Sequence, residues 1–282
     1  MAISASDVKQ LREKTGAGPA DCKKALESTK GDFAAAEKML KEKGLAAIEK
    51  RAGRATNEGK IFIKIQDDTA VILELAAETD FVARNPEFTA LGELVLNRAL
   101  EKGYTEPNEE LNHLVLDLAT KIRENMGLKR LTVLKAGAGE ILAQYIHGDG
   151  AIGVLVKAAA DKPEVLHTEE AQAFIFTLAL HVAAFNPVVL DRSKVDPALL
   201  AEQSLLFRKQ IESDEVLAKK PEKVREGILK GKIDNYLKSI CFLDQGYVKD
   251  EKLSVAQALS EYSKKLGTAL TIVDYIYFKV GQ

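Results

Sequence analysis

The stretch Ala70–Val82 reads Ala-Val-Ile-Leu-Glu-Leu-Ala-Ala-Glu-Thr-Asp-Phe-Val. Its first half is an apolar run of the length expected for a mostly buried β-strand. Helical spacing of apolar residues resumes after Pro86, so Asp80 and Phe81 are expected at a corner between a strand and a helix. A phenylalanine at such a corner can pack on its own helix as a hydrophobic staple, or it can insert into a partner protein. The pattern alone leaves both interpretations open.

Residues 5–45 have the pattern of three short helices. The first is expected to end at Gly16, since glycine readily adopts the left-handed conformation that closes a helix. Pro19 suits the first turn of the second helix, where its missing N–H costs no hydrogen bond. The third is expected to begin after Asp32 and to end at Gly44, followed by a short helix and a polar linker over 46–58. Such a unit has a small core and resembles the ubiquitin-associated fold, usually a docking module.

The middle of the chain contains an internal repeat. Residues 59–75 and 139–156 share a pattern of alternating apolar residues on either side of a turn. The turns are Asp67-Asp68 and Gly148-Asp149-Gly150, residue types that tolerate tight-turn dihedrals. Each copy predicts a β-hairpin, and helices are expected near 87–101 and 108–125 in the first half and near 168–184 in the second. We therefore expect two related α+β subdomains.

Residues 188–240 interrupt the second subdomain. They are rich in charge and contain two series of apolar residues at helical spacing, with Pro221 where the second helix would begin. This pattern predicts an inserted antiparallel helical hairpin. A helix near 253–266 and a last strand over 271–280 complete the chain. The expected fold class is α+β, with an N-terminal ubiquitin-associated-like domain and linker over 1–54 and core subdomains over 55–139 and 140–282.

The composition excludes several classes of protein. The 282 residues are 46% hydrophobic and 29% charged, as in ordinary globular proteins. No apolar run approaches the roughly 18 residues that span a bilayer, and the first residues lack the order of a signal peptide. Cys22 and Cys241 fit a reducing compartment, so a cytoplasmic protein is expected. The net charge of -2 gives no footprint for nucleic acid, and Lys50, Arg51 and Arg54 suit the end of a helix.

No catalytic or metal site emerges from the sequence. The four histidines, His113, His147, His167 and His181, lack the spacing of metal ligands. His181 lies among alanine and valine and is expected to be a packing residue, whereas His147 precedes a glycine-rich turn and suits an exposed partner contact. The chain has no phosphate-binding loop and no nucleophile elbow. A non-enzymatic protein without cofactor or metal is expected.

Two longer motifs carry a resemblance to a known family. Residues 11–26 read Leu-Arg-Glu-Lys-Thr-Gly-Ala-Gly-Pro-Ala-Asp-Cys-Lys-Lys-Ala-Leu, and residues 79–82 read Thr-Asp-Phe-Val. In this order and at this spacing they closely resemble the bacterial elongation factor Ts family, the nucleotide-exchange factors for elongation factor Tu. Shorter matches at 144–148, 153–156, 181–187 and 243–245 extend the resemblance to about residue 280.

The resemblance implies a partner and contact residues. The partner is elongation factor Tu, GDP-bound and nucleotide-free, with no direct nucleic-acid or membrane contact. Thr79, Asp80, Phe81 and Val82 are expected to insert between helices of its GTPase domain and to disturb the magnesium site and the phosphate-binding loop. Arg12 and the loop Thr15, Gly16, Ala17, Gly18, Pro19 and Ala20 are expected to contact the same domain. His147, in the second subdomain, is expected on another domain of the partner, and the hairpin can support a homodimer.

Three departures from the family pattern are visible. Pro19-Ala20 stands where the family usually has two methionines, which removes flexible apolar contact area. Gln245-Gly246-Tyr247 replaces the commoner Gln-Pro-Phe, and the sequence ends at Gln282 without the extra C-terminal helix of some members. Contacts of that helix are therefore not carried over.

Two other functions stay open from the sequence. A generic adaptor would bind its partner through residues 1–54 alone, and the core would be dispensable. An enzyme would lose turnover when His147 or His181 is replaced, with folding intact.

Overall fold

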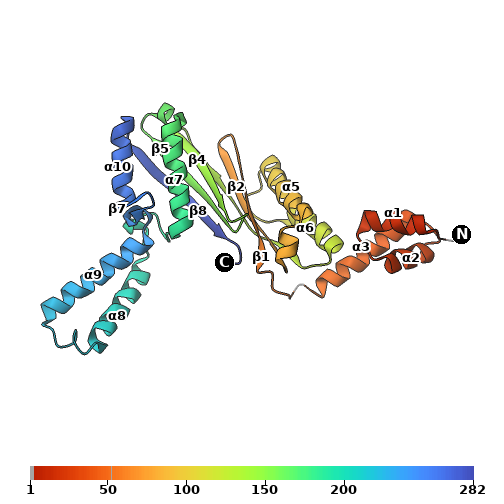
Figure 1. Ribbon diagram of the computed structural model, residues 1–282, viewed down its shortest axis with the longest axis horizontal. Helices are drawn as coiled ribbons and strands as arrows, with labels where there is room; N and C mark the ends of the chain where they lie inside the picture. Colours follow the sequence, from red (N-terminus) through yellow and green to blue (C-terminus); the bar gives the residue numbers. More distant parts are fainter. Residues whose placement is uncertain (1–2, 52) are drawn as a thin grey trace. The chain divides into compact units, whose positions relative to one another are not determined.

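The structure, a computed structural model, describes residues 3–51 and 53–282. Helices and strands are both abundant (Figure 1), and the expected α+β class is confirmed. The chain divides into two compact units. Unit 1 comprises Met1–Lys135, Ile146–Gly153 and Phe278–Gln282, and unit 2 comprises Ala136–Tyr145 and Val154–Tyr277. The division into 1–54, 55–139 and 140–282 stays a prediction.

Unit 1 begins with three helices, α1 (Ala5–Thr15), α2 (Pro19–Ser28) and α3 (Phe33–Glu49). As predicted, Gly16 closes α1 with a φ of 66°, and Pro19 occupies the first turn of α2. The helices bury a small core made of Leu11, Ala17, Cys22, Ala25, Leu26, Ala36 and Leu40. Seven buried side chains make a marginal core, so contacts with the rest of unit 1 contribute to holding these helices in place.

Helix α3 does not end at Gly44, and that prediction was wrong. The helix continues to Glu49 and absorbs the short helix expected after residue 46. A Cβ atom at position 44 would lie 2.2 Å from Cγ2 of Thr120, on helix α6 (Glu109–Ile122). Gly44 is therefore a contact glycine where α3 meets α6, and its cost to helix propensity is offset by that close approach.

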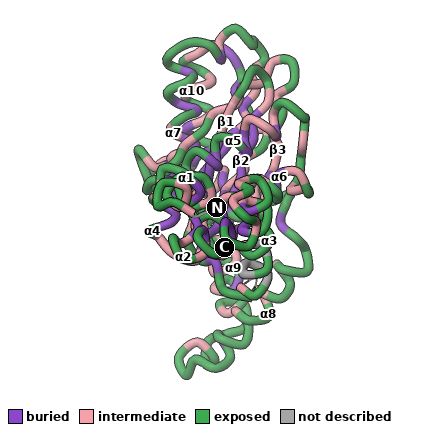
Figure 2. Tube along the Cα trace, turned by 90° about the vertical axis from the view of Figure 1, so that its right-hand side faces the viewer, coloured by how far each residue is buried: buried purple, intermediate pink, exposed green. Residues whose placement is uncertain are grey.

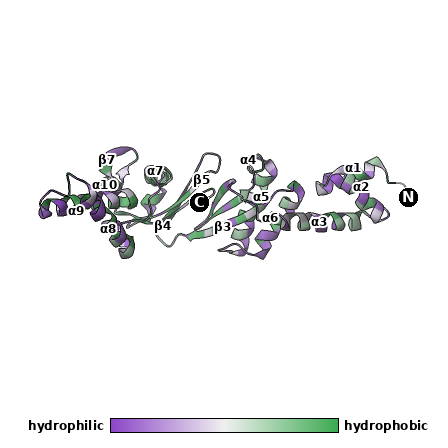
Figure 3. Ribbon diagram, turned by 90° about the horizontal axis from the view of Figure 1, so that it is seen from below, coloured by the Kyte–Doolittle hydropathy of each residue, from purple (hydrophilic) through white to green (hydrophobic). Residues whose placement is uncertain are grey.

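A three-stranded antiparallel sheet forms the centre of unit 1. Its order is β1 (Glu58–Gln66), β2 (Thr69–Ala77) and β3 (Met126–Lys135). The predicted hairpin turn is present, with Asp67 at a φ of 54°. Helices α5 (Pro86–Lys102) and α6 pack with the sheet around a core that includes Phe62, Leu73, Phe88 and Leu96. Strand β2, the middle strand, is buried over eight of its nine residues, and Figure 3 shows hydrophobic residues along β3.

The sequence did not reveal strand β3. Its pairing with β2 shifts register between Glu74 and Leu75, where Arg130 and Leu128 are the successive partners. The extra residue at this bulge breaks the two-residue alternation by which a strand is recognised. The buried positions consequently fall at Met126, Leu128, Leu131 and Leu134.

The last residues of the chain are held against this sheet by a buried ion pair. Glu74 is 2% exposed and accepts from Arg130 Nε at 2.7 Å and from the Gly281 N–H at 2.9 Å. Arg130 also donates to the Lys279 carbonyl at 2.8 Å and lies 3.9 Å from the ring centroid of Phe278. The carboxylate is therefore satisfied at both oxygens, as a buried charge must be.

Unit 2 contains most of a second three-stranded sheet, in the order β4 (Glu140–His147), β5 (Ile152–Ala160) and β8 (Leu270–Lys279). Helices α7 (Glu169–Phe185) and α10 (Val255–Leu266) are joined by the stacked rings of Phe174 and Tyr262, with centroids 3.9 Å apart. A small pair of strands, β6 (Gly246–Tyr247) and β7 (Asp250–Ser254), was not predicted. The 3-10 helices are η1 (Pro163–His167), η2 (Arg192–Lys194) and η3 (Phe242–Asp244).

His181 is a packing residue, as predicted. It is fully buried between the rings of Phe185 and Phe242, at centroid distances of 4.6 and 5.4 Å. The Val248 N–H donates to Nδ1 at 3.2 Å, so Nε2 carries the proton and donates to Oε1 of Gln245 at 2.9 Å. Burial lowers the pKa of His181, which keeps the imidazole neutral.

The two helices predicted within residues 188–240 are α8 (Pro197–Ser213) and α9 (Glu222–Ile240), which lie side by side in opposite directions (Figure 1). Buried residues gather at the base of this pair, namely Val195, Leu237, Ile240 and Cys241. Helix α8 is largely exposed (Figure 2), with half-exposed leucines at 205 and 206. In the described part of the chain, no helix is long and apolar enough to cross a membrane.

Candidate functional site

The corner Glu78–Val82 follows strand β2 and includes the first three residues of the short helix α4 (Asp80–Ala83). Thr79 is the N-cap of α4, with extended backbone and a side chain that accepts from the Val82 N–H at 3.4 Å. Asn85 then caps α5, and Pro86 occupies its first turn. The predicted corner between a strand and a helix is therefore present, and two N-cap residues, Thr79 and Asn85, follow one another closely along it.

Neighbouring side chains at this corner point to opposite environments. Val82 and Ala83 are 6% and 5% exposed and belong to the core of unit 1, whereas Phe81 is 83% exposed. No other large hydrophobic side chain in the described part of the chain is more exposed than Phe81. The staple interpretation of Phe81 is wrong, since a staple would be packed on its own helix. The buried pair anchors the corner, and Phe81 is left available for contact.

Polar contacts hold the corner against the turn between α6 and β3. The Thr79 hydroxyl donates to both carboxylate oxygens of Glu124, at 3.0 and 3.1 Å. Glu78 accepts from the Asn125 N–H at 2.7 Å and from Arg54 Nη1 at 3.0 Å. The Asn125 hydrogen bond, and to a smaller extent Arg54, lower the pKa of Glu78. Sequence reasoning missed the contacts of Glu124, Asn125 and Arg54 with this corner, because nothing local relates residues 24 to 47 positions apart.

Asp80 presents a charge beside Phe81. Its side chain is 45% exposed and lies 3.3 Å from the guanidinium of Arg84, one helical turn later. An exposed pair of this type contributes little to stability. The Asp80 carboxylate can therefore exchange Arg84 for a cation or an N–H group of a partner without a large loss.

The N-terminal residues expected to bind the partner are not all exposed. Arg12, Gly16, Pro19 and Ala20 are exposed, and Thr15 and Gly18 are intermediate. Ala17 is 7% exposed and belongs to the small helical core. A Cβ atom at Gly16 would lie 2.7 Å from Cγ of Lys121, so this side of the loop faces helix α6 of the same chain. Of the residues expected to contact the partner, Arg12, Gly16, Pro19 and Ala20 therefore keep an exposed surface, whereas Ala17 does not.

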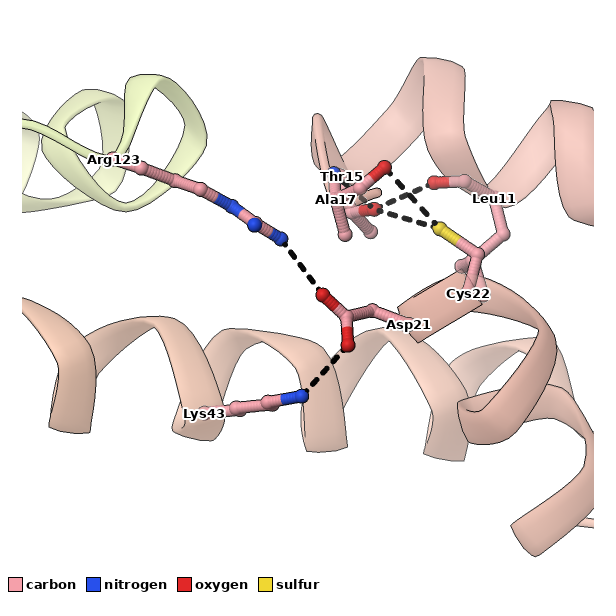
Figure 4. A network of polar contacts seen from close by, with 7 residues as sticks. All are labelled: Leu11, Thr15, Ala17, Asp21, Cys22, Lys43 and Arg123. Carbon is pink, nitrogen blue, oxygen red and sulfur yellow. Dashed lines mark hydrogen bonds and ion pairs between the residues drawn. The ribbon is translucent and has the colours of Figure 1, made fainter. Parts of the chain in front are cut away.

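An ionic network joins the N-terminal helices to the end of α6 (Figure 4). Asp21 accepts from Lys43 at 2.8 Å and from Arg123 at 3.2 Å, and these hydrogen bonds, Lys43 first, lower its pKa. Lys41 and Asp117 form a second pair across the same contact at 2.7 Å. A cleft of about 320 Å³ remains between α6 and these helices. The contact therefore combines ion pairs and an open cleft with close packing at Gly16 and Gly44.

His147 ends strand β4 and is exposed. The turn after it, residues 148–150, has positive φ at all three positions. It is held on strand β1 by Lys60, whose Nζ lies 2.9 Å from Asp149, and by a hydrogen bond of 2.8 Å from the Ile61 N–H to the Gly150 carbonyl. His147 therefore belongs to unit 1, like the corner and the N-terminal helices.

Among the described residues, no group of three or more histidine, cysteine or acidic side chains could hold a metal ion. The site therefore consists of an exposed aromatic ring on a fixed corner, an exposed loop and a cluster of ion pairs. Such groups suit the binding of a protein surface, where a central aromatic residue contributes much of the affinity.

Comparisons with known proteins agree with this description. A family model described as Elongation factor TS matches residues 78–282. A protein of Treponema denticola named Elongation factor Ts is 49% identical over 281 residues, which cover 100% of this chain and 99% of that protein. Proteins of the same name are 43% identical in Treponema pallidum (100% of this chain, 99% of that protein) and 38% identical in Borrelia hermsii (100% of both). The chain therefore belongs to the elongation factor Ts family.

Proposed function

We propose that this protein is a guanine-nucleotide exchange factor for elongation factor Tu and acts in translation elongation. It binds the GDP-bound and the nucleotide-free partner and performs no covalent chemistry. Family membership supports the partner, and the exposed ring of Phe81 on an anchored corner carries the proposal. The proposed compartment is the cytoplasm.

The corner is the proposed working part. Phe81 inserts into the GTPase domain of the partner, and burying its ring contributes about 2 kcal/mol. Thr79 and Val82 hold the corner, while Asp80 redirects a cation or N–H group of the partner. Magnesium bridges the phosphates of the bound nucleotide, so loosening its surroundings removes a large favourable charge interaction.

Thermodynamic linkage relates the weakening of GDP binding to the affinity of the factor for its partner. A factor that weakens GDP binding a thousandfold has a coupling free energy of about 4 kcal/mol, and GDP must weaken binding of the factor equally. Neither nucleotide is selected by the factor. The cellular excess of GTP over GDP determines which one replaces the released GDP.

The remaining parts have proposed roles as binding surfaces. The three N-terminal helices form a ubiquitin-associated-like module that contacts the same GTPase domain through Arg12 and the loop Thr15–Ala20. The two hairpin-containing subdomains are related copies, and His147 contacts another domain of the partner. The inserted hairpin α8–α9 supports a homodimer through its half-exposed leucines.

Release of fluorescent GDP from elongation factor Tu, chased with unlabelled nucleotide, tests this function. If the wild-type protein accelerates release and the Phe81→Ala variant accelerates it less, the proposed function is supported. If the wild-type protein leaves the release rate unchanged, the proposed function is contradicted and the adaptor interpretation is favoured.

A further inference from the structure

The turn between α6 and β3, Arg123–Asn125, contacts both surfaces assigned to the partner. Arg123 ends α6 in the left-handed conformation, with a φ of 68°, and Met126 begins β3. We propose that this turn couples the N-terminal helices to the Glu78–Val82 corner, with Glu124, Asn125 and Arg54 as positioning residues. The inference rests on the proposed function only where it treats the two surfaces as partner-binding surfaces. The coupling between them is a property of the free chain.

On the corner side, Glu124 fixes the hydroxyl of Thr79. A hydroxyl has one proton, and here it points to the Glu124 carboxylate at 3.0 and 3.1 Å. The oxygen lone pairs are then free to accept from the Val82 N–H. Without Glu124 the hydroxyl can rotate, the cap on α4 weakens, and Phe81 loses its defined direction.

On the linker side, three hydrogen bonds close a ring. Glu78 accepts from the Asn125 N–H at 2.7 Å and from Arg54 Nη1 at 3.0 Å, and the Asn125 side chain donates to the Arg54 carbonyl at 3.0 Å. Arg54 lies five residues after the end of α3, in the segment that leads from the N-terminal helices to β1. A displacement of this segment therefore acts directly on Glu78, the first residue of the corner.

On the side of the N-terminal helices, the same turn is held by Arg123. Its guanidinium pairs with Asp21 on α2 (Figure 4), and its carbonyl accepts from Arg51. Gly16 lies against Lys121 in the last turn of α6. When a partner moves these helices, the turn moves with them, so contact at the N-terminal loop changes how the corner presents Phe81.

Amide hydrogen exchange in the free, full-length chain tests the coupling. Arg54→Ala is expected to accelerate exchange of the Asn125 amide about fivefold, the effect of losing one hydrogen bond in the ring. Lys50→Ala, an exposed cation four residues earlier, is the matched control and leaves that amide unchanged. Asp21→Asn is expected to accelerate the Asn125 and Val82 amides, and Glu27→Gln on the same helix, whose pair with Lys23 is exposed, is its control. Equal exchange in each variant and its control overturns the coupling.

GDP release from elongation factor Tu tests the positioning roles. Glu124→Ala is expected to lower the maximal release rate about tenfold while the half-saturating concentration changes less than about twofold, because only the corner is disturbed. Glu124→Gln, which keeps an acceptor for the Thr79 hydroxyl, is expected to restore the rate. A change confined to the half-saturating concentration, or no rescue by glutamine, overturns the role of Glu124. If Glu124→Ala does not fold, Arg54→Ala replaces it in the same measurement. If the wild-type protein leaves the rate of GDP release unchanged, the proposed function is refuted. The hydrogen-exchange measurement on the free chain then still tests the coupling.

Discussion

Replacing Phe81 by alanine is expected to leave the free energy of unfolding within about 0.5 kcal/mol of wild type. The reason is that Phe81 is 83% exposed and contributes little to the core of the free protein. Val82, the next residue, is 6% exposed. Val82→Ala removes two buried methyl groups, or about 1.6 kcal/mol at 0.8 kcal/mol per group, and the cavity left behind adds to that loss.

Urea unfolding of the two variants, followed by far-UV circular dichroism, measures both values. The same variants are compared in partner binding, where the order of effects is expected to reverse. Phe81→Ala loses about 2 kcal/mol of contact with elongation factor Tu, equivalent to roughly 30-fold in affinity or rate. A loss of more than about 1 kcal/mol of stability in Phe81→Ala would refute the reasoning, since the ring would then be part of the protein's own packing.

Two further predictions concern titration and the C-terminal residues. Because burial lowers the pKa of His181, the unfolded chain binds an extra proton as pH falls below the ordinary value of about 6.5. The neutral His181 therefore contributes fully to the free energy of unfolding above that pH. This contribution decreases as the pH falls, until the pKa of His181 in the folded state is reached. Urea unfolding between pH 7.5 and 5.5 is expected to show a shallower decrease in His181→Gln, and an unchanged slope would contradict this account. Glu74→Gln is expected to cost about 1–3 kcal/mol and to accelerate exchange of the Gly281 amide, which donates to that carboxylate. Unchanged protection of Gly281 would mean that the ion pair with Arg130 does not hold the end of the chain.

Sequence patterns predicted the elements whose signals are local. The end of α1 at Gly16, the start of α2 at Pro19, the turn at Asp67 and the corner at Thr79 depend on residues within one turn of the chain, and their types reveal the conformation. Strand β3 was missed and the end of α3 was misplaced because the cause of each is distant in the sequence. The bulge opposite Glu74 hides the alternation of β3, and Gly44 serves a contact with Thr120 instead of ending a helix.

In the candidate site, too, local features were predicted from the sequence and distant contacts were not. The motif around Phe81 was visible because its residues are consecutive, and only the structure separates the exposed ring from the buried Val82 beside it. The supporting contacts from Arg54, Glu124 and Asn125 required the fold, since pairing of β2 with β3 brings the α6–β3 turn to the end of β2. The roles of Arg12, the loop Thr15–Ala20 and His147 in partner binding stay predictions.

The most direct test of the central claim is the rate of fluorescent GDP release from elongation factor Tu, measured with wild type, Phe81→Ala and Glu27→Gln as an exposed control. The account predicts release accelerated by orders of magnitude by wild type and by the control, and acceleration roughly 30-fold smaller with Phe81→Ala. Release accelerated equally by Phe81→Ala and by wild type would contradict the claim that the exposed ring at this corner performs the exchange.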